Sequence, residues 1–509
     1  MTPDRLNLVL AAGALVLLAA VAAVRLTGRL GLPSLLGYLA IGLLIGESGL
    51  GVQFSDTALT QTLGLVALAL ILAEGGLTTR WATIRPALLF AAVLSTVGVV
   101  VSVSVVAGFA HLALGLDLRT AVLLGAIVSS TDAAAVFSVL RRLSLRGRLP
   151  AALEAESGFN DAPVVLLVSL VASSSWGHVS PLTTLATVGY ELAAGAVIGL
   201  LVGRIGQILL ARSALPAAGL YPLATLALVL LAYATAGLAH ASGFLAVYVA
   251  ALWLGNARLP HRRAVLGFAE GVAWLAQISL FVLLGLLASP SRLPSAVGPA
   301  LAVGTALLLV ARPASVLVSA APFRLLGRWG AAMSPWSWRE QIFLSWAGLR
   351  GAVPIVLTTI PATEGLASAR RLFDLVFVLV VVFTLLQAPT LPAVARRLNV
   401  IAPERTRELD VDVAPLDDLH ADLLQVTVPA GSQLAGVYVD ELRLPPGAAV
   451  TLVARVGATL VPDRNTRLLE GDQLVLISTA QARPAVERRL RAVSRAGRLA
   501  RWKGETGAP

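Results

Sequence analysis

Two short polar stretches interrupt otherwise apolar runs of this sequence, and they hold the residues best suited to chemistry. The first is SSTDAAA (129–135) and the second is ESGFND (156–161). Serine and threonine compete for backbone hydrogen bonds, and small residues allow other helices to approach closely. We therefore predict a locally unwound helix at the first stretch, with carbonyl and hydroxyl oxygens open to a bare cation. In the second stretch, one broad helical face carries Glu156, Ser157, Asn160 and Asp161.

These oxygens predict a binding site for a monovalent cation. Na⁺ and K⁺ are hard ions that need oxygen ligands, as the hard divalent cations do. The candidate ligands are the Asp132 and Asp161 carboxylates, the Ser157 hydroxyl and the Thr131 carbonyl. A carboxylate can also carry a proton, so cation and proton would compete for Asp161, and that competition is what exchange requires. The structural alternative is a polar contact that only holds helices together, although no apolar run contains a lysine that could pair with these acids.

A third motif, SWAGLRGAVP (345–354), predicts a second broken helix. Gly348, Gly351 and Pro354 stand near the middle of its apolar run. Two broken helices that meet at the membrane midplane would place half-helix dipoles side by side. Arg350 could offset the negative ends of these half-helices or form an ion pair with Glu156.

Two more charged residues in apolar runs need an explanation, because ionisable groups are costly at membrane depth. Glu74 lies in LAEGGL (72–77), at the inner end of its run. It could line the route by which a cation enters, or cap its helix at the membrane surface. We interpret Arg312 as a structural residue whose long side chain could reach the inner membrane surface.

The composition indicates a membrane protein. Of the 509 residues, 57% are hydrophobic and 13% are charged, against about 25% charged residues in soluble domains, and the mean hydropathy is +0.83. An ordinary soluble enzyme and a disordered chain are therefore excluded. The absence of cysteine excludes disulfides, thiolate catalysis and cysteine-based metal sites. The net charge of +11 comes from arginines in short gaps between apolar runs, which indicates membrane topology and not a nucleic-acid partner.

Thirteen apolar runs approach the length of about 20 residues that a membrane-spanning helix needs. They lie near 6–27, 34–50, 58–78, 86–112, 119–140, 150–174, 181–211, 217–239, 241–257, 265–288, 295–321, 338–361 and 371–395. When alternate gaps are assigned to one side, eighteen arginines of residues 1–400 fall on that side and five on the other. This bias predicts an N-terminus outside the cell and a cytoplasmic segment after residue 396.

The apolar runs also contain a weak internal repeat. LGYLAIGLLIG (36–46) and SGFLAVYVAALWLG (242–255) each open a short run after a turn. If they correspond, helices one to six match helices eight to thirteen, with the seventh as connector. The two halves would then be inverted in the membrane, as in many secondary transporters. The alternative is that glycine-rich apolar segments resemble one another by composition.

The composition of the sequence changes from apolar to polar near residue 400. Residues 399–422 are acidic and polar, and we interpret them as a linker. Short alternating runs follow at 423–429, 448–456 and 472–478, separated by turn residues, and they predict a small β-rich domain. Residues 484–509 form a basic tail, which could be a helix, a segment that contacts anionic lipid, or a solvated end.

The three polar motifs together resemble a known family. SSTDAAAV (129–136), ESGFNDAPV (156–164) and GLRGAVPI (348–355) are similar to the monovalent cation:proton antiporters of the bacterial NhaP type, over about residues 6–398. The same broad family includes the eukaryotic sodium/proton exchangers. The resemblance implies an all-α polytopic fold of thirteen helices, a homodimer, and a mobile core with two crossed broken helices that alternates access like an elevator. It also implies a transporter of the bacterial inner membrane, with no enzymatic activity, no cofactor and no resident metal.

The resemblance assigns a role to each motif residue. Asp161 is the main carboxylate of an Asn–Asp pair, and Asn160 fills the position of a second acid in electrogenic relatives. The pair therefore implies electroneutral exchange of one cation for one proton. The remaining site residues are Thr131 and Asp132 of the unwound helix, Ser157 as a cation ligand, Glu156 with Arg350 as a stabilising ion pair, and Glu74 at an acid position where relatives often carry Asp.

Residues 428–478 resemble an RCK C-terminal domain, the TrkA-C-like module. Such domains accompany K⁺ transport systems and bind small regulatory ligands, in some cases cyclic di-AMP. The resemblance therefore favours K⁺ over Na⁺ as the exchanged cation. No GxGxxG motif follows a predicted strand, so NAD is not expected. The implied domains are an exchanger (1–398), a linker (399–422), a regulatory domain (423–483) and a tail (484–509).

Two other functions are compatible with a membrane protein that carries such a domain. A monovalent cation channel gated by the tail would need a selectivity filter, and the sequence has no TVGYG-like segment. A membrane sensor, whose helices only anchor the tail, would leave the buried Asp132 and Asp161 as unexplained costs.

Overall fold

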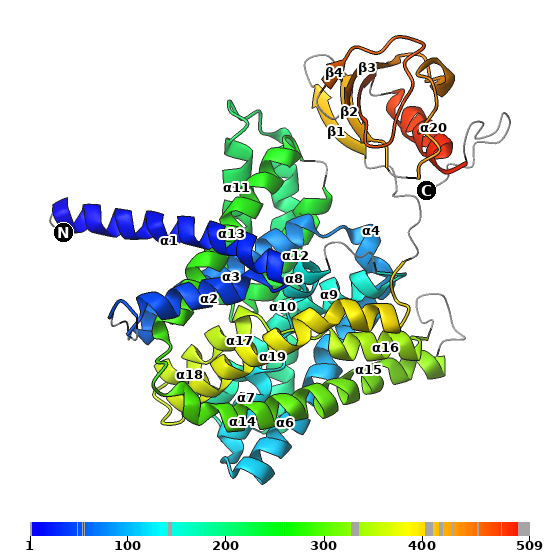
Figure 1. Cartoon of the computed structure of the whole chain (residues 1–509). Coiled ribbons are helices and arrows are strands. Elements are labelled where there is room, and N and C mark those ends of the chain that lie inside the picture. The colour runs from blue at the N-terminus through cyan, green and yellow to red at the C-terminus, as the bar shows by residue number, and fades with distance from the viewer. Residues whose placement is uncertain are drawn as a thin grey trace. The chain divides into compact units, whose positions relative to one another are not determined.

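A computed structural model describes residues 3–47, 49–52, 54, 56–140, 145–178, 180–257, 259–326, 335–402, 411–416, 421–429, 431–455, 458–479 and 481–496. The chain divides into two compact units, residues 1–401 and 402–509. The first unit is helical and the second is built on a β-sheet, as Figure 1 shows.

The first half of the helical unit follows the predicted order of apolar runs. It begins with α1 (Pro3–Leu30), α2 (Ser34–Ile45) and α3 (Thr57–Thr78). A long helical run follows, made of α4 (Trp81–Ile84), η1 (Arg85–Ala87), α5 (Leu88–Val93), η2 (Leu94–Gly98) and α6 (Val99–Leu114). The half ends with α7 (Leu118–Ile127), α8 (Ala133–Val139) and α9 (Leu149–Ala172).

The second half repeats this succession after the connecting helix α10 (Pro181–Arg212). Its first helices are α11 (Leu220–Leu238), α12 (Gly243–Asn256) and α13 (Arg262–Leu287). Another long run contains α14 (Leu293–Ala306), η3 (Leu307–Ala311) and α15 (Arg312–Leu326). The last elements are α16 (Trp338–Trp346), α17 (Ala352–Leu357), α18 (Thr359–Thr363) and α19 (Ala369–Arg397).

The helices confirm a multi-pass membrane protein. Within the described residues, nine helical segments are long and apolar enough to cross a membrane, and four shorter apolar helices accompany them. The short ones are α2, α12, α7 and the α17–α18 segment. They belong to the second, ninth, fifth and twelfth predicted runs, so the last two are halves of broken helices.

The internal repeat is visible in the details of both halves. In each half the second helix is short, the fourth contains a π-helical segment (η2 and η3), and the fifth is broken. Packing follows the same symmetry, because α2 packs on α13 and α12 packs on α3. The inverted repeat is therefore a property of the fold and not of amino-acid composition alone.

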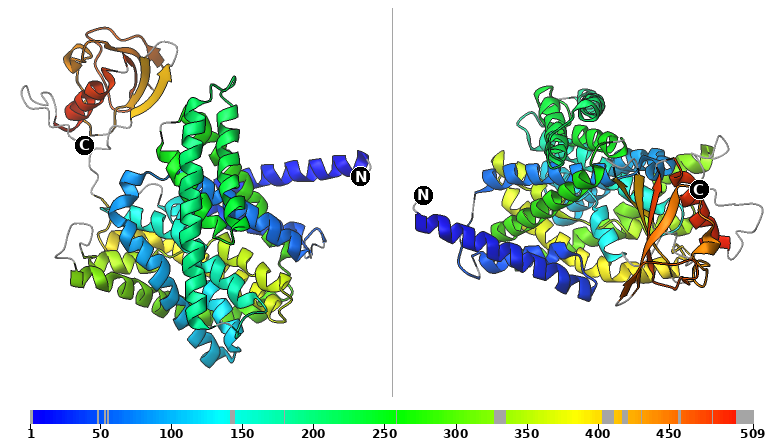
Figure 2. Two further views of the ribbon diagram at one scale, coloured as in Figure 1. Left: turned by 180° about the vertical axis from the view of Figure 1, so that it is seen from behind. Right: turned by 90° about the horizontal axis from the view of Figure 1, so that it is seen from above.

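The helices gather into two bundles. In the α3 bundle (α1–α3 and α10–α13), α3 packs most extensively against α12 and α13. In the α9 bundle (α4–α9 and α14–α19), α9 packs most extensively against α5, α7 and η2. Helix α1 leans on α2 but is exposed along most of its length (Figures 1 and 2). Three connections pass between the bundles: α3 to α4, α9 to α10, and α13 to α14.

The second unit is a five-stranded antiparallel sheet covered by one helix. The strands are β1 (Val411–Leu416), β2 (Ala421–Thr427), β3 (Ala448–Arg455), β4 (Ala458–Leu460) and β5 (Gln473–Thr479), in the spatial order β1-β2-β5-β3-β4. A short helix, η6 (Asp440–Leu442), lies between β2 and β3. In register, Leu424 of β2 faces Leu476 of β5, and Val453 of β3 faces Leu474. The predicted strands 423–429, 448–456 and 472–478 are confirmed as β2, β3 and β5.

Two segments outside the predicted strands also belong to this sheet domain. β1 lies inside the expected linker, where it pairs with β2 at the edge of the sheet, and an edge strand tolerates Pro415 because one row of its backbone groups needs no partner. Helix α20 (Arg483–Ala496) lies in the expected basic tail. Its Val486, Leu490 and Val493 are buried in the core of the domain, since they recur at helical spacing among the arginines.

Candidate functional site

The two broken helices cross at their unwound segments. Helix α7 ends at Ile127 and α8 begins at Ala133, while α16 ends at Trp346 and α17 begins at Ala352. The backbone N–H of Asp132 donates to the Leu349 carbonyl at 2.8 Å. The Nε–H of Arg350 donates to the Val128 carbonyl, also at 2.8 Å. Each unwound segment therefore satisfies polar groups of the other, as membrane-depth backbone requires.

Asp161 lies at the first unwound segment, as predicted. It projects from α9 and is 6% exposed. The Ser130 hydroxyl donates to its Oδ1 at 2.6 Å. Among the described residues, no hydrogen bond reaches the other carboxylate oxygen, Oδ2. Ser130 belongs to the predicted unwound segment, but no feature of the sequence distinguishes it from its neighbours as the partner of Asp161.

Asn160 and Thr131 form a second contact between α9 and the same segment. The Asn160 Nδ2 donates to the Thr131 Oγ1 at 2.6 Å, and both residues are buried. The amide oxygen of Asn160 is also buried and has no hydrogen-bond partner among the described residues. A buried amide oxygen without a donor is costly. Coordination of a cation by the Asn160 amide oxygen would remove this cost.

Asp132 stands where the unwound segment turns back into a helix. Its carboxylate caps α8 by accepting from the Ala135 N–H at 3.2 Å. The other broken helix passes so close that a Cβ added to Gly351 would lie 2.1 Å from the Asp132 Oδ2. Glycine at this position therefore allows the two unwound segments to touch. The structure brings Asp132 to the crossing but records no direct hydrogen bond between it and Asp161.

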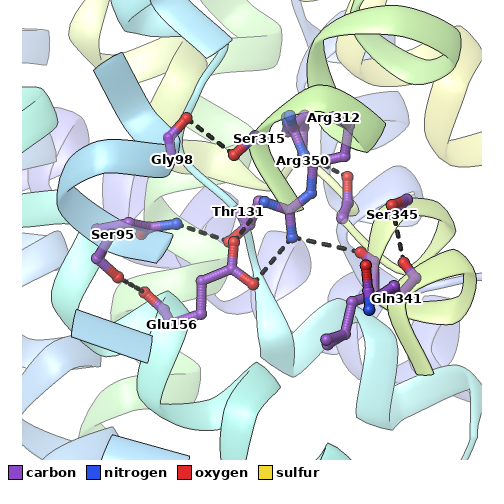
Figure 3. Close-up of polar contacts among 12 residues, drawn as sticks. Ser95, Gly98, Thr131, Glu156, Arg312, Ser315, Gln341, Ser345 and Arg350 are labelled. Carbon is purple, nitrogen blue, oxygen red and sulfur yellow. Dashed lines mark hydrogen bonds and ion pairs between the residues drawn. The ribbon is translucent and has the colours of Figure 1, made fainter. Parts of the chain in front are cut away.

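The expected ion pair between Glu156 and Arg350 is wrong, because Arg312 binds Glu156 instead. The Arg312 Nη1 lies 2.5 Å from Glu156 Oε1, and its Nη2 donates to Oε2 at 2.9 Å. Both side chains are almost completely buried, and Figure 3 shows them facing each other across the interior of the α9 bundle. Arg312 begins α15 directly after η3. Its side chain does not extend to a surface, because the buried guanidinium forms a bidentate ion pair with the carboxylate.

Arg350 instead lies at the negative end of a half-helix, which was the alternative role predicted for it. Besides Val128, its guanidinium donates to the carbonyl of Gly348. Val128 is the C-cap residue of α7, so its carbonyl lies at the negative end of that half-helix. Arg350 therefore provides donors and a positive charge to buried carbonyls at the crossing.

Ser157 and Glu74 are predicted site residues that lie on α9 and α3. Ser157 is half-buried on α9, one turn before Asp161. Glu74 is half-buried near the end of α3 and helps to line a small cavity between α3, α11 and α13. Its carboxylate interacts electrostatically with those of Glu270 and Glu154. No contact joins Glu74 to the crossing in the part of the chain that the structure describes.

Glu154 was not predicted, although the sequence contains a signal for it. With Ser157 and Asp161 it falls at positions i, i+3 and i+7 of α9, which lie along one face of a helix. Its carboxylate accepts a short hydrogen bond from the Thr79 hydroxyl, between α3 and α4. Arg312 and Glu156 were both found by the rule that charges at membrane depth need an explanation, but their pairing was not predicted.

Comparison with known proteins agrees with this architecture. Residues 15–397 match the family described as sodium/hydrogen exchanger, transmembrane, and residues 423–491 match the TrkA-C domain. The protein named K(+)/H(+) antiporter NhaP2 of Shewanella oneidensis is 35% identical over 503 residues, which cover 96% of this chain and 84% of that protein. K(+)/H(+) antiporter NhaP of Alkalimonas amylolytica is 35% identical over 486 residues, covering 94% and 82%.

The chain is also similar to a Na(+)/H(+) antiporter at lower identity and to a solved antiporter structure. Na(+)/H(+) antiporter ApNhaP of Aphanothece halophytica is 29% identical over 388 residues, which cover 72% of this chain and 71% of that protein. The sodium proton antiporter MjNhaP1 of Methanocaldococcus jannaschii superposes with a TM-score of 0.65 at 22% identity. That superposition covers 77% of this chain and 99% of the other, and shows a shared fold. The chain therefore belongs to the sodium/hydrogen exchanger family, as a multi-pass cation/proton antiporter with a C-terminal TrkA-C domain.

Proposed function

We propose that the protein exchanges one K⁺ for one proton, electroneutrally, at a site centred on Asp161, with Na⁺ as a second possible cation. The observation that carries the proposal is the buried Asp161 carboxylate, which has one oxygen on Ser130 and faces an unwound helix. One such group can hold a cation or a proton, but not both. Competition for the same group couples the two movements.

The cation would be held by oxygens around the crossing. We assign Asp161 Oδ2 and the unpartnered Asn160 Oδ1 as ligands, since both are acceptors without a donor in the described structure. Oxygens of Thr131, Ser157 and Asp132 complete the set, in keeping with the oxygen preference of hard cations. Asn160 is neutral, so only one carboxylate of the Asn–Asp pair can carry a proton. This supports a ratio of one cation to one proton.

Access would alternate between the two sides by movement of one bundle against the other. Asp161 and both broken helices belong to the α9 bundle, so that bundle would carry the bound ion. The Glu156–Arg312 pair would keep it rigid. Glu74 of the α3 bundle would line the route by which the cation enters. We expect a homodimer, with exchange located in residues 1–398.

K⁺ is favoured because relatives that match both parts of the chain bear the name K(+)/H(+) antiporter. The matching TrkA-C domain supports regulation of exchange by a small ligand, for which cyclic di-AMP is a candidate. The arginine bias of the sequence supports a bacterial inner-membrane protein with its N-terminus outside and this domain in the cytoplasm.

Exchange can be tested in liposomes that contain the purified protein and a pH-sensitive dye. Addition of K⁺, Na⁺ or Li⁺ outside should alkalinise the interior of vesicles loaded at acidic pH, without dependence on membrane potential. Asp161→Asn and Asp161→Ala should abolish the response. Asp56→Asn is a matched control, since Asp56 only caps α3 and asparagine caps equally well. Exchange that survives Asp161→Ala would contradict the site, and a current that reverses at the K⁺ potential would indicate a channel.

Regulation can be tested by a truncation after Ala402, the first residue of the second unit. The truncated protein should exchange K⁺ but lose its response to cyclic di-AMP and change its activity profile with pH. If truncated and full-length proteins behave alike under all conditions, the domain has no regulatory role.

A further inference from the structure

The connection between α3 and α4 is very short for a joint between two moving bundles. Only Thr79 and Arg80 separate the two helices. Two residues span at most about 7 Å, so they must absorb a change of angle wherever the α9 bundle moves relative to the α3 bundle. A few residues at the ends of elements commonly act as such hinges.

The α3 bundle holds this connection through Asn256, at the end of α12. The Asn256 amide nitrogen donates to the Thr79 carbonyl at 2.9 Å and to the Leu252 carbonyl at 2.8 Å. Its amide oxygen accepts from the Trp81 N–H at 2.8 Å. One side chain therefore binds both ends of the connection.

The α9 bundle holds the same connection through Glu154. The Thr79 hydroxyl, on a residue that is 3% exposed, donates to the Glu154 carboxylate. Glu154 lies on the face of α9 that carries Asp161, about 10 Å away along the axis at 1.5 Å per residue. The bond therefore ties the ion-carrying helix directly to the hinge.

This face of α9 also meets the α3 bundle between Glu154 and Asp161. The ring of Tyr248, on α12, packs on the α9 backbone so closely that a Cβ added to Gly158 would lie 2.4 Å from it. The same ring makes an edge contact with Phe159, with centroids 5.4 Å apart. Displacement of α9 along α12 would move both contacts, together with Glu154.

From these contacts we infer that Glu154 is a positioning residue of the exchange cycle, whose hydrogen bond with Thr79 stabilises one of the two access states. The inference rests on the proposed alternating access. The bond joins α9 to the hinge, which Asn256 holds on the α3 bundle, so we expect it to break when the α9 bundle moves to the other state. Loss of the bond would therefore depopulate the state described here and leave the binding site itself intact.

The test compares half-saturating K⁺ concentrations from the two faces of the membrane, in vesicles of opposite orientation. Thr79→Val removes the hydroxyl, whereas Thr79→Ser keeps it. Thr79→Val and Glu154→Ala should raise the half-saturating concentration on one face and lower it on the other, because apparent affinity follows the population of the competent state. Their ratio should change about fivefold, the factor for a typical net hydrogen bond. Thr79→Ser should restore the ratio of the unsubstituted protein.

The matched control is Thr62→Val, at an exposed threonine of the same helix α3, whose hydroxyl donates to the Ala58 carbonyl of that helix. It should leave both concentrations unchanged. A merely structural role for Glu154 would lower the yield or the maximal rate without a difference between the faces, and this result would overturn the inference. If the unsubstituted protein shows no exchange dependent on Asp161, the proposed function fails instead.

A second experiment uses the absence of cysteine from the chain. The paired substitutions Thr79→Cys and Glu154→Cys provide two thiols that a short bifunctional methanethiosulfonate can join. The joined protein should lose exchange, and a reductant should restore it. The paired protein without reagent gives the reference rate, and mass spectrometry confirms the link. Exchange by the linked protein at the reference rate would overturn the inference.

Discussion

Arg312 binds the Glu156 carboxylate through its two terminal nitrogens, Nη1 and Nη2, at 2.5 and 2.9 Å, in the interior of the α9 bundle. Two side-chain-to-backbone hydrogen bonds lie beside this contact. Ser95 donates to the Glu156 carbonyl at 3.2 Å, and Ser315 donates to the Gly98 carbonyl at 2.8 Å (Figure 3). Both π-helical segments therefore meet at this pair, since Ser95 and Gly98 belong to η2 and Arg312 follows η3.

The ion pair predicts how stability should respond to substitution. Arg312→Met leaves a buried carboxylate without its partner, which costs about 3–5 kcal/mol. The melting temperature of the purified protein should fall by several degrees. Addition of Glu156→Gln to Arg312→Met should recover most of the loss, because the uncompensated charge is then removed. If the double variant is less stable than Arg312→Met alone, the two residues do not act as a pair.

Gly351 should be intolerant of a side chain. A methyl group there would overlap the Asp132 carboxylate, and such overpacking costs about 1–3 kcal/mol. We expect Gly351→Ala to reduce the rate of K⁺/H⁺ exchange in liposomes at least tenfold. Gly271→Ala is the control, since its Cβ would meet open space on α13. Equal rates for the two variants would show that the crossing tolerates separation of its segments.

Asn160 should determine the charge that moves in each cycle. Asn160→Asp adds a second carboxylate beside Asp161, so the site could carry two protons against one cation. We expect exchange by this variant to depend on membrane potential, whereas exchange by the unsubstituted protein does not. The measurement is the dye response at potentials set by valinomycin in vesicles that exchange Na⁺. An Asn160→Asp variant that stays active and insensitive to potential would contradict this role.

The sheet domain should lose stability in acid through one ion pair. Arg455 donates from Nε and Nη2 to the two Asp472 oxygens, each at 2.8 Å, and this hydrogen bonding holds the pKa of Asp472 below its ordinary value of 3.8. A carboxyl group whose pKa is lowered by folding stabilises the domain above its unfolded pKa, and that contribution disappears as the pH falls through the folded pKa. Stability should therefore decrease below about pH 4.

Hydrogen exchange of the β2, β3 and β5 amides in the full-length protein, corrected for intrinsic rates, measures this effect. Asp472→Asn should reduce protection at neutral pH and flatten its decline in acid. Asp440→Asn is the control, because Asp440 is exposed in η6. An unchanged acid profile in Asp472→Asn would assign the decline to other groups.

Much of the architecture could be predicted from the sequence, because its signals are local. Apolar runs of membrane length, the glycines and Pro354 of the second break, and the serines of the first follow from backbone hydrogen bonding in lipid. The strands of the C-terminal domain follow from alternation of apolar residues. β1 was missed because an edge strand that carries Pro415 resembles a linker. The helix in the expected tail could be predicted from its periodicity, because three apolar residues recur there at helical spacing and are buried in the domain core.

By itself, the sequence predicted the residues that we propose for ion exchange: Asp161 and Asn160 on one helix, and Ser130, Thr131 and Asp132 on a segment expected to be unwound. Only the tertiary structure decided how they are paired. The sequence favoured Arg350 as the partner of Glu156. The partner in the structure is Arg312, because helices that carry residues 156 positions apart in the chain pack together. Likewise, the bond from Thr79 to Glu154 spans 75 residues. Periodicity specifies the face of a helix, but it does not specify which other helix that face meets.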